Sequence, residues 1–190
     1  QEKLLSDMEL PLANVLAKME MAGIKVSGGV LSEIGLENEK VIADLTAEIY
    51  ELAGETFNIN SPKQLGVILF EKMQLPVIKK TKTGYSTAVD VLEQLAPQAP
   101  IVDKILKFRQ ISKIQSTYVT GLLGEIMADG KIHTRYIQDL TQTGRLSSVQ
   151  PNLQNIPVRL AEGRKIRKAF LPEKSESVLL SSDYSQIELR

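Results

Sequence analysis

The sequence contains no cysteine, no tryptophan and only one histidine, His133, among its 190 residues. Without cysteine the chain can form neither a disulfide nor a thiolate metal site, which fits a reducing compartment such as the cytoplasm. A single histidine excludes a metal centre built from several histidines. No apolar run approaches the roughly 18 residues that a membrane-spanning helix needs. We therefore expect a cytoplasmic protein without a membrane anchor.

The chain also lacks a net charge, because 23 Lys and Arg residues balance 23 Asp and Glu residues. Taken alone, this balance argues against a nucleic-acid partner. The charges are unevenly distributed, however. Residues 1–55 hold 4 basic and 11 acidic residues, whereas the rest of the chain holds 19 basic and 12 acidic residues. Such an asymmetry is compatible with phosphate contacts made by one part of the chain only.

The first two thirds of the chain show the periodicity of helices. Apolar residues recur at helical spacing, and Gly23 and Gly54 are plausible helix ends. Ser61 and Gln64 match a capping box, with a proline at the first helical position. A short extended link is predicted at residues 24–26. The predicted helices cover residues 5–22, 30–53, 61–73, 87–97 and 101–128.

Basic residues gather at two places in this helical region. Residues 74–86 combine three lysines with glycine and small hydroxyl residues, which predicts a flexible basic loop. In the longest predicted helix, Arg109 and Lys113 are four residues apart and therefore neighbours on its surface. Both places suit contacts with phosphates, and both also suit an ordinary solvated surface. The lysines of the loop are Lys79, Lys80 and Lys82.

The pattern changes at Asp129-Gly130, which is a turn signal. Residues 131–138 alternate between apolar and polar side chains, as a β-strand does. Residues 143–157 are too polar to build a core and predict a loop. Several of their side chains could bind base edges through the acceptors that the minor groove presents whatever the sequence. These are Arg145, Gln150, Asn152, Gln154 and Asn155.

The last stretch of the chain combines an apolar run with a carboxylate. Val178–Leu180 has the length and the β-branched start of a buried strand, which would end at Asp183. Ser185 and Glu188 then match a capping box that opens a helix. A carboxylate at the end of a rigid strand suits a hard cation, although it can equally be a polar turn residue. Because such a strand needs neighbours and so short a helix buries nothing, we expect the chain to be part of a longer protein.

Two strings in this region resemble a known family. DYSQIELR, at residues 183–190, resembles the first catalytic motif of the bacterial DNA polymerase I family, also called family A. TGRLSSVQPNLQNIP, at residues 143–157, resembles a second signature of that family. The resemblance implies an α+β fold, with a helical thumb and part of the antiparallel-sheet palm of a right-hand polymerase. Residues 1–24 would be the join from an exonuclease-like domain, 25–128 the thumb and 129–190 the first part of the palm.

The resemblance also implies an activity and a set of partners. The complete protein would carry out template-directed DNA synthesis, adding dNTPs to a primer 3′-hydroxyl with two Mg²⁺ ions, in replication and repair. Its partners would be primer–template DNA and dNTPs, and it would be a monomer. This chain alone would bind DNA without catalysis, because the second catalytic aspartate and the nucleotide-binding fingers helix of the family have no match in it.

The same resemblance assigns roles to residues. Asp183 and the backbone carbonyl of Tyr184 would bind the metal ions. Glu188 would block a ribose 2′-hydroxyl, and Arg145 would reach the minor groove at the primer end, so that both join Asp183 as catalytic residues. The residues expected to line the dNTP site are Tyr184, Ser185, Gln186, Ile187 and Glu188. The residues expected to contact DNA are Lys79, Lys80, Lys82, Arg109, Lys113, Arg145, Asn152, Gln154 and Asn155.

Three other interpretations remain open from the sequence. One is a non-catalytic nucleic-acid-binding module, and another is a helical interaction protein that reuses the fold. A single-subunit RNA polymerase would use similar chemistry, but Glu188 argues against it.

Overall fold

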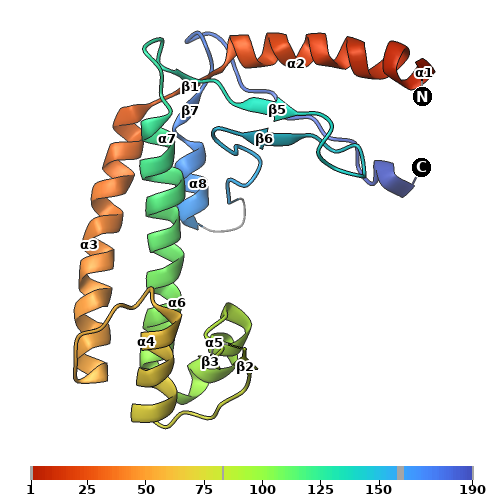
Figure 1. Cartoon of the computed structure of the whole chain (residues 1–190). Coiled ribbons are helices and arrows are strands. Elements are labelled where there is room, and N and C mark those ends of the chain that lie inside the picture. Colours follow the sequence, from red (N-terminus) through yellow and green to blue (C-terminus); the bar gives the residue numbers. More distant parts are fainter. Residues whose placement is uncertain (1, 83, 158–160, 190) are drawn as a thin grey trace. The chain divides into compact units, whose positions relative to one another are not determined.

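The computed structural model describes residues 2–82, 84–157 and 161–189 and divides the chain into two compact units. The first unit contains residues 1–32 and 121–190, and the second contains residues 33–120 (Figure 1). Helices dominate, and every strand pairing in the described residues is antiparallel. The expected α+β class is therefore confirmed.

The first unit contains short helices and five of the strands. Its helical segments are α1 (Glu2–Leu4), the π-helix η1 (Leu5–Glu9), α2 (Leu10–Ala22), the start of α3 (Gly28–Ala53), α7 (Gly121–Gly124), α8 (Ala161–Arg167) and the 3-10 turn η5 (Ile187–Leu189). Its strands are β1 (Ile24–Val26), β4 (Lys131–Ile132), β5 (Arg135–Ile137), β6 (Ser147–Val149) and β7 (Phe170–Leu171). They form one sheet of order β4-β1-β7 and a separate β5-β6 pair.

The second unit is helical apart from one hairpin. After the remainder of α3 come α4 (Pro62–Gly66), η2 (Val67–Lys72), the strands β2 (Lys80–Thr81) and β3 (Gly84–Tyr85), α5 (Val89–Leu95), η3 (Ala96–Gln98), α6 (Pro100–Lys113) and η4 (Ile114–Thr120). The predicted helices in this region are confirmed with three differences. The helices predicted at 61–73 and 101–128 contain the π-helical segments η2 and η4, and the longer one ends at Gly124 and not at residue 128. α3 lies beside the α6–η4 segment, where Asn38 Nδ2 donates to Gln115 Oε1 at 3.1 Å (Figure 1).

The core of the second unit forms where α3, α4, η2, α5 and α6 meet. Fully buried leucine and isoleucine side chains fill it, and each is worth roughly 1.5–3 kcal/mol when removed from water. The largest of them are Ile49, Leu65, Leu69, Leu92, Leu95, Ile101 and Ile105.

The start of α4 follows the predicted capping box only in part. Ser61 Oγ accepts from the backbone N–H of Gln64 at 3.4 Å, as the N-cap residue should. Gln64 Oε1, however, accepts from the backbone N–H of Asn58 at 2.7 Å and not from that of Ser61. The side chain therefore ties the preceding turn to the helix instead of closing the reciprocal bond.

In the first unit, β1 is the central strand of the three-stranded sheet, with Ile24 opposite Ile132 and Val26 opposite Phe170. The sequence did not predict α8, whose Ile166 is fully buried. Gly163 is needed there, because a Cβ atom at this position would lie 2.4 Å from the carbonyl oxygen of Pro157.

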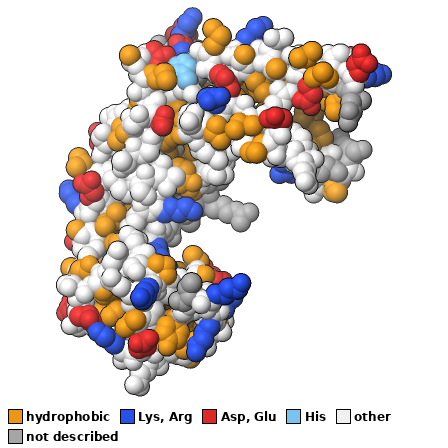
Figure 2. Space-filling view, in the orientation of Figure 1, with side chains coloured by type: hydrophobic (Ala, Val, Ile, Leu, Met, Phe, Trp, Pro, Cys, Tyr) orange, Lys and Arg blue, Asp and Glu red, His pale blue; other side chains and the backbone are white. Residues whose placement is uncertain are grey.

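The apolar stripe of α2 is largely exposed. Only Leu16 is buried in this helix, while Val15, Met19 and Met21 are exposed. Figure 2 shows hydrophobic side chains along the surface of α2. The helix itself and its stop at Gly23, which has a φ of 61°, are confirmed.

Two predictions for the end of the chain are wrong. Val178–Leu180 forms no strand, and Val178 and Leu180 are 84% and 90% exposed, because no described strand pairs with this run. Ser185 opens no α-helix: Gln186 has a φ of 53° and η5 is a single 3-10 turn. A strand needs a second strand to pair with, and a short helix needs other elements to pack against. The described residues supply neither at this end of the chain.

Candidate nucleic-acid interface and active-site residues

The basic loop of the second unit contains an ordered hairpin. β2 pairs with β3, with Lys80 opposite Tyr85, and Thr81 Oγ1 donates to the carbonyl oxygen of Gly84 at 3.1 Å. The ammonium of Lys80 lies 5.7 Å from the centre of the Tyr85 ring, a cation–π contact. The predicted loop therefore contains a short strand pair that carries three exposed lysines on it or next to it. These are Lys79, Lys80 and Lys82.

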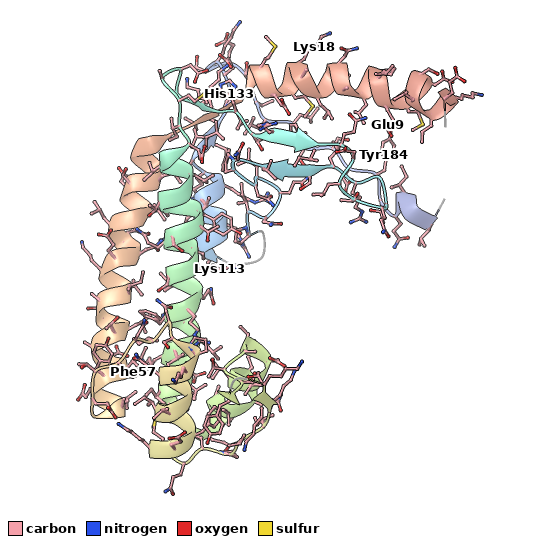
Figure 3. All side chains as sticks on the ribbon, in the orientation of Figure 1. Glu9, Lys18, Phe57, Lys113, His133 and Tyr184 are labelled. Atoms are coloured by element: carbon pink, nitrogen blue, oxygen red, sulfur yellow. The ribbon has the colours of Figure 1, made fainter. Side chains whose placement is uncertain are left out.

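Arg109 binds the chain that follows the hairpin. Its guanidinium donates to the carbonyl oxygen of Thr87 at 2.5 Å and to Thr87 Oγ1 at 3.3 Å. Burial lowers the pKa of Arg109, which remains a cation at neutral pH. Lys113, one turn later on α6, is exposed (Figure 3). The two predicted neighbours therefore differ, since only Arg109 has a clear structural role.

A cleft lies between α4, the hairpin and Arg109. Its volume is about 800 Å³, and Ser61, Thr87 and Arg109 are among its lining residues. Lys63 and the acidic Glu71 line it as well, and the guanidinium of Arg109 is bound to Thr87. The lining therefore carries charges of both signs and does not by itself indicate a phosphate site. Ser61 and Thr87 were not predicted as site residues, although the N-cap signal places Ser61 at the start of a helix.

The polar segment 143–157, predicted to be a loop, contains the strand β6, which pairs with β5 so that Tyr136 lies opposite Ser148. Gln154 Oε1 accepts from the backbone N–H of Ser148, and Gln154 Nε2 donates to the carbonyl oxygen of Leu146, both at 3.3 Å. Asn152 Oδ1 accepts from the backbone N–H of Gln154 at 2.9 Å. The amide side chains of Asn152 and Gln154 therefore stabilise the segment itself.

The same segment presents the remaining predicted DNA contacts at the surface. Arg145 and Asn155 are exposed, and Thr141 Oγ1 donates to the carbonyl oxygen of Arg145 at 2.7 Å. The peptide bond between Gln150 and Pro151 is cis. Contacts of these residues with DNA remain predictions.

Beneath this segment two hydroxyl groups are buried that the sequence analysis missed. Thr134 and Ser148 are 6% and 0% exposed, and their hydroxyl oxygens are 2.7 Å apart. The signal for Thr134 was the strand alternation, which gave it the inward position between Ile132 and Tyr136. Nothing in the sequence pointed to Ser148.

Residues 183–187 at the predicted catalytic end are exposed, including Asp183 and Tyr184. The side chain of Glu188 lies outside the described part of the structure. Within the described residues no three His, Cys, Asp or Glu side chains gather as a metal site would require. Asp183 and the Tyr184 carbonyl are suitable oxygen donors for Mg²⁺, but by themselves they form only part of a donor set. The roles of Ser185, Gln186 and Ile187 remain predictions.

The single histidine joins α2 to the strand region of the first unit (Figure 3). His133 Nδ1 lies 2.7 Å from the carbonyl oxygen of Glu20, and Nε2 lies 3.0 Å from Asp129 Oδ2. These hydrogen bonds, that to Glu20 first, raise the pKa of His133, and the bond from His133 lowers the pKa of Asp129. The ring packs on Gly23, where a Cβ atom would approach it to 2.7 Å.

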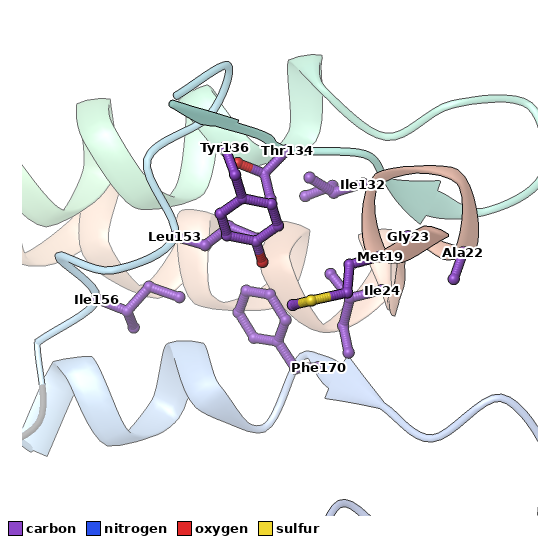
Figure 4. Close-up of a pocket in the computed structure, with 10 residues that line it drawn as sticks. All are labelled: Met19, Ala22, Gly23, Ile24, Ile132, Thr134, Tyr136, Leu153, Ile156 and Phe170. Atoms are coloured by element: carbon purple, nitrogen blue, oxygen red, sulfur yellow. The ribbon is translucent and has the colours of Figure 1, made fainter. Parts of the chain in front are cut away.

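An apolar cavity of about 440 Å³ lies in the first unit (Figure 4). The aromatic rings of Tyr136 and Phe170 line it together with Thr134 and Leu153. None of the predicted site residues lines this cavity, so it is separate from the residues predicted to bind DNA, dNTP or metal.

No helix in the described part of the chain is long and apolar enough to cross a membrane.

Comparison with known proteins identifies relatives over the whole chain. The model of DNA polymerase family A matches residues 29–190. The DNA polymerase I of Lactococcus lactis subsp. lactis (strain IL1403) is 77% identical over 190 residues, which are 100% of this chain and 22% of that protein. The DNA polymerase I of Geobacillus stearothermophilus is 58% identical over 191 residues, again 100% of this chain and 22% of that protein.

A solved structure is similar as well: the POL domain of Pol1 from M. smegmatis in complex with DNA primer-template and dNTP. It superposes with a TM-score of 0.85 at 45% sequence identity, covering 88% of this chain and 30% of that one. The chain spans about a fifth of the length of the curated relatives that it matches. On the family match and these identities, the chain belongs to DNA polymerase family A.

Proposed function

We propose that this chain supplies the thumb and the first part of the palm of a template-directed DNA polymerase, in a protein as long as its relatives. The observation that carries the proposal is the likeness, at 45% identity, to a polymerase domain in complex with primer-template DNA and dNTP. The exposed basic hairpin and the polar segment 143–157 support it, since both offer donors for a duplex.

In this proposal the two surfaces bind different parts of the duplex. Lys79, Lys80 and Lys82 on the hairpin, with Lys113 on α6, bind phosphates and supply affinity that does not depend on the base sequence. Arg145 and Asn155 approach the minor groove, whose acceptors are alike for all base pairs. A polymerase requires this combination, because it must hold any sequence and still test the shape of the base pair.

Asp183 is the residue of this chain that would take part in the chemistry directly. Its carboxylate and the Tyr184 carbonyl would hold Mg²⁺ together with acidic residues from outside this chain. Bound Mg²⁺ would stabilise the attacking and leaving oxygens of the phosphoryl transfer. Glu188 would restrict the space beside the sugar of the incoming nucleotide, and residues 184–187 would line the same site.

The decisive experiment uses the longer protein, with Asp183→Asn as the variant. Asparagine keeps the shape of the side chain and removes the charge that balances the metal ions. We expect single-turnover incorporation to be nearly abolished while the Kd for primer–template DNA stays close to that of the parent protein. A rate that falls by less than about tenfold, or about 1.4 kcal/mol of barrier, would rule out Asp183 as a shared metal ligand.

A second function applies to the chain by itself: a DNA-binding module without catalysis. The observation in its favour is the exposed basic hairpin, which offers contacts with phosphates without any catalytic group. Primer extension with the 190-residue chain, Mg²⁺ and all four dNTPs tests this function: we expect no elongated product, and elongation that depends on Asp183 would contradict it.

A further inference from the structure

The segment that is proposed to face the minor groove is attached to the strands by the buried hydroxyl groups of Thr134 and Ser148. Thr134 Oγ1 lies 2.8 Å from the carbonyl oxygen of Pro151 and 3.1 Å from that of Val149. Ser148 Oγ accepts from the backbone N–H of Leu153 at 3.1 Å. Two small side chains therefore contact the segment at three backbone groups, and Thr134 itself immediately precedes β5.

The number of hydrogen atoms decides the direction of these bonds. Each hydroxyl has one proton to donate and can accept two bonds. The two shortest distances are 2.7 Å between the hydroxyls and 2.8 Å from Thr134 to Pro151, whereas Ser148 Oγ lies 3.3 Å from the Pro151 oxygen. The two shortest distances both become hydrogen bonds when the Ser148 hydroxyl donates to Thr134 Oγ1 and the Thr134 hydroxyl donates to the carbonyl oxygen of Pro151.

The result is a chain of bonds that runs in one direction: Leu153 N–H to Ser148, Ser148 to Thr134, and Thr134 to the Pro151 carbonyl. It begins and ends in the segment, at residues only two positions apart. Such chains strengthen each bond through polarisation, and burial raises the cost of breaking one. Gln154 closes the segment from the exposed side through its bonds to Ser148 and Leu146.

We propose that Thr134 and Ser148 are positioning residues that fix the backbone of residues 145–155, and thereby set Arg145, Asn152 and Asn155 for contact with the duplex. The proposal rests on the proposed DNA-binding function. Asn152 and Gln154 add to this effect through their own hydrogen bonds within the segment. Neither hydroxyl touches DNA itself, since both are buried.

The test compares Thr134→Val with Thr134→Ser in the 190-residue chain. Valine matches the shape of threonine without a proton to donate, so the chain of bonds loses its last donor. Serine keeps the hydroxyl and should restore the bonds. Ser147→Ala is the matched control for Ser148→Ala, because alternation along β6 places its side chain on the opposite face.

Two readouts are needed. The first is the Kd for a fluorescently labelled primer–template duplex at fixed salt, and the second is amide hydrogen exchange at Leu153, measured by NMR. We expect Thr134→Val and Ser148→Ala to raise the Kd about tenfold and to speed exchange at Leu153. Thr134→Ser and Ser147→Ala should stay within about threefold of the parent chain in both. Circular dichroism shows which variants are folded. If Thr134→Val does not fold, Ser148→Ala is used for the test in its place.

The outcomes separate the two proposals. If the parent chain has no salt-dependent affinity for DNA, the proposed function fails, and the positioning role fails with it. If the parent binds and folded Thr134→Val binds equally well, only the positioning role is overturned. Weaker binding in Thr134→Val that Thr134→Ser does not restore would also overturn it, because the loss would not then follow the hydroxyl.

Discussion

Glu188 lies in the 3-10 turn η5, five residues after Asp183. Because a metal ion at Asp183 would fix the triphosphate, the sugar of the nucleotide would lie close to this turn. In the longer protein, Glu188→Ala should therefore open the site to ribonucleotides. We expect the ratio of kcat/KM for a dNTP to that for the matched rNTP to fall about a hundredfold, or about 2.7 kcal/mol.

The alternative is that Glu188 has only a local role in the turn η5 and does not contact the sugar. In that case Glu188→Ala would slow both nucleotides alike. Glu188→Gln is the control, because glutamine keeps the size of the side chain and should keep the ribonucleotide excluded. A dNTP-to-rNTP ratio that does not change in Glu188→Ala would refute the steric role.

The environment of His133 predicts that the stability of the fold depends on pH. The folded-state pKa of His133 is raised by hydrogen bonds to the Glu20 carbonyl and to Asp129, so the imidazolium form stabilises the fold. This stability is fully present below the ordinary histidine pKa and is lost as the pH rises through the raised value. Because the sequence has one histidine, its ring protons give a single NMR titration.

We expect the His133 pKa to lie above its ordinary value and to fall in Asp129→Asn, which removes the carboxylate but keeps the side-chain shape. The unfolding free energy of the parent chain should decrease over the same pH window, and that of the variant should change less. An identical titration in the two proteins would mean that the bond between His133 and Asp129 does not exist in solution. Lys131 and Glu173 also lie near this group and must stay unchanged.

At the scale of elements, two of the four cations on α6 have different expected roles. Arg109 holds Thr87 behind the hairpin, whereas Lys113 is exposed one turn later. Arg109→Met should leave the buried Thr87 groups without a donor, at a cost of roughly 1–3 kcal/mol. Lys113→Met should change the unfolding free energy by less than about 0.5 kcal/mol.

Thermal unfolding and DNA binding of the same two variants decide whether Arg109 is structural. A shift in Tm of roughly 2–4 °C for each kcal/mol is expected for a protein of this size, in Arg109→Met only. Lys113→Met should instead weaken DNA binding at an unchanged Tm. If Arg109→Met weakened DNA binding without any loss of Tm, Arg109 would be a phosphate contact and not a structural one.

The elements also show which parts of the structure could be predicted from the sequence. The long helices could, because their periodicity and their stops at Gly23 and Gly54 are local signals. The strand expected at Val178–Leu180 could not form, since a strand exists only when a neighbour pairs with it and the described residues provide none. β6 was missed for the opposite reason: its partner β5 makes a strand of a sequence that is locally polar.

The candidate site, too, could be predicted from the sequence only in part. Motifs indicated the chemistry of Asp183 and Arg145, because their types and order match a family. The hydrogen bonds of Arg109, Gln154 and Ser148 could not be predicted, since they join residues that are close only after folding. Each of the three binds at least one backbone group, and such groups leave no mark in a sequence.

At the scale of the whole molecule, a net charge of zero hides the division between an acidic N-terminal part and a basic remainder. Binding of a duplex by this chain therefore depends on where its lysines lie and not on their number. The exposed hairpin with Lys79, Lys80 and Lys82 is one basic surface, in the unit that contains residues 33–120. Figure 2 shows basic side chains over the end of the molecule that carries this hairpin.

The most direct measurement is the affinity of the 190-residue chain for a primer–template duplex across a series of salt concentrations. Replacing Lys79, Lys80 and Lys82 together by Ala should flatten the slope of log affinity against log salt by roughly 0.9 for each phosphate that a lysine no longer neutralises. The control replaces three exposed lysines of the acidic part, Lys3, Lys18 and Lys40, with the same change in net charge. We predict salt-dependent binding that only the hairpin variant weakens. Absent binding, or equal slopes in all three proteins, would contradict the account.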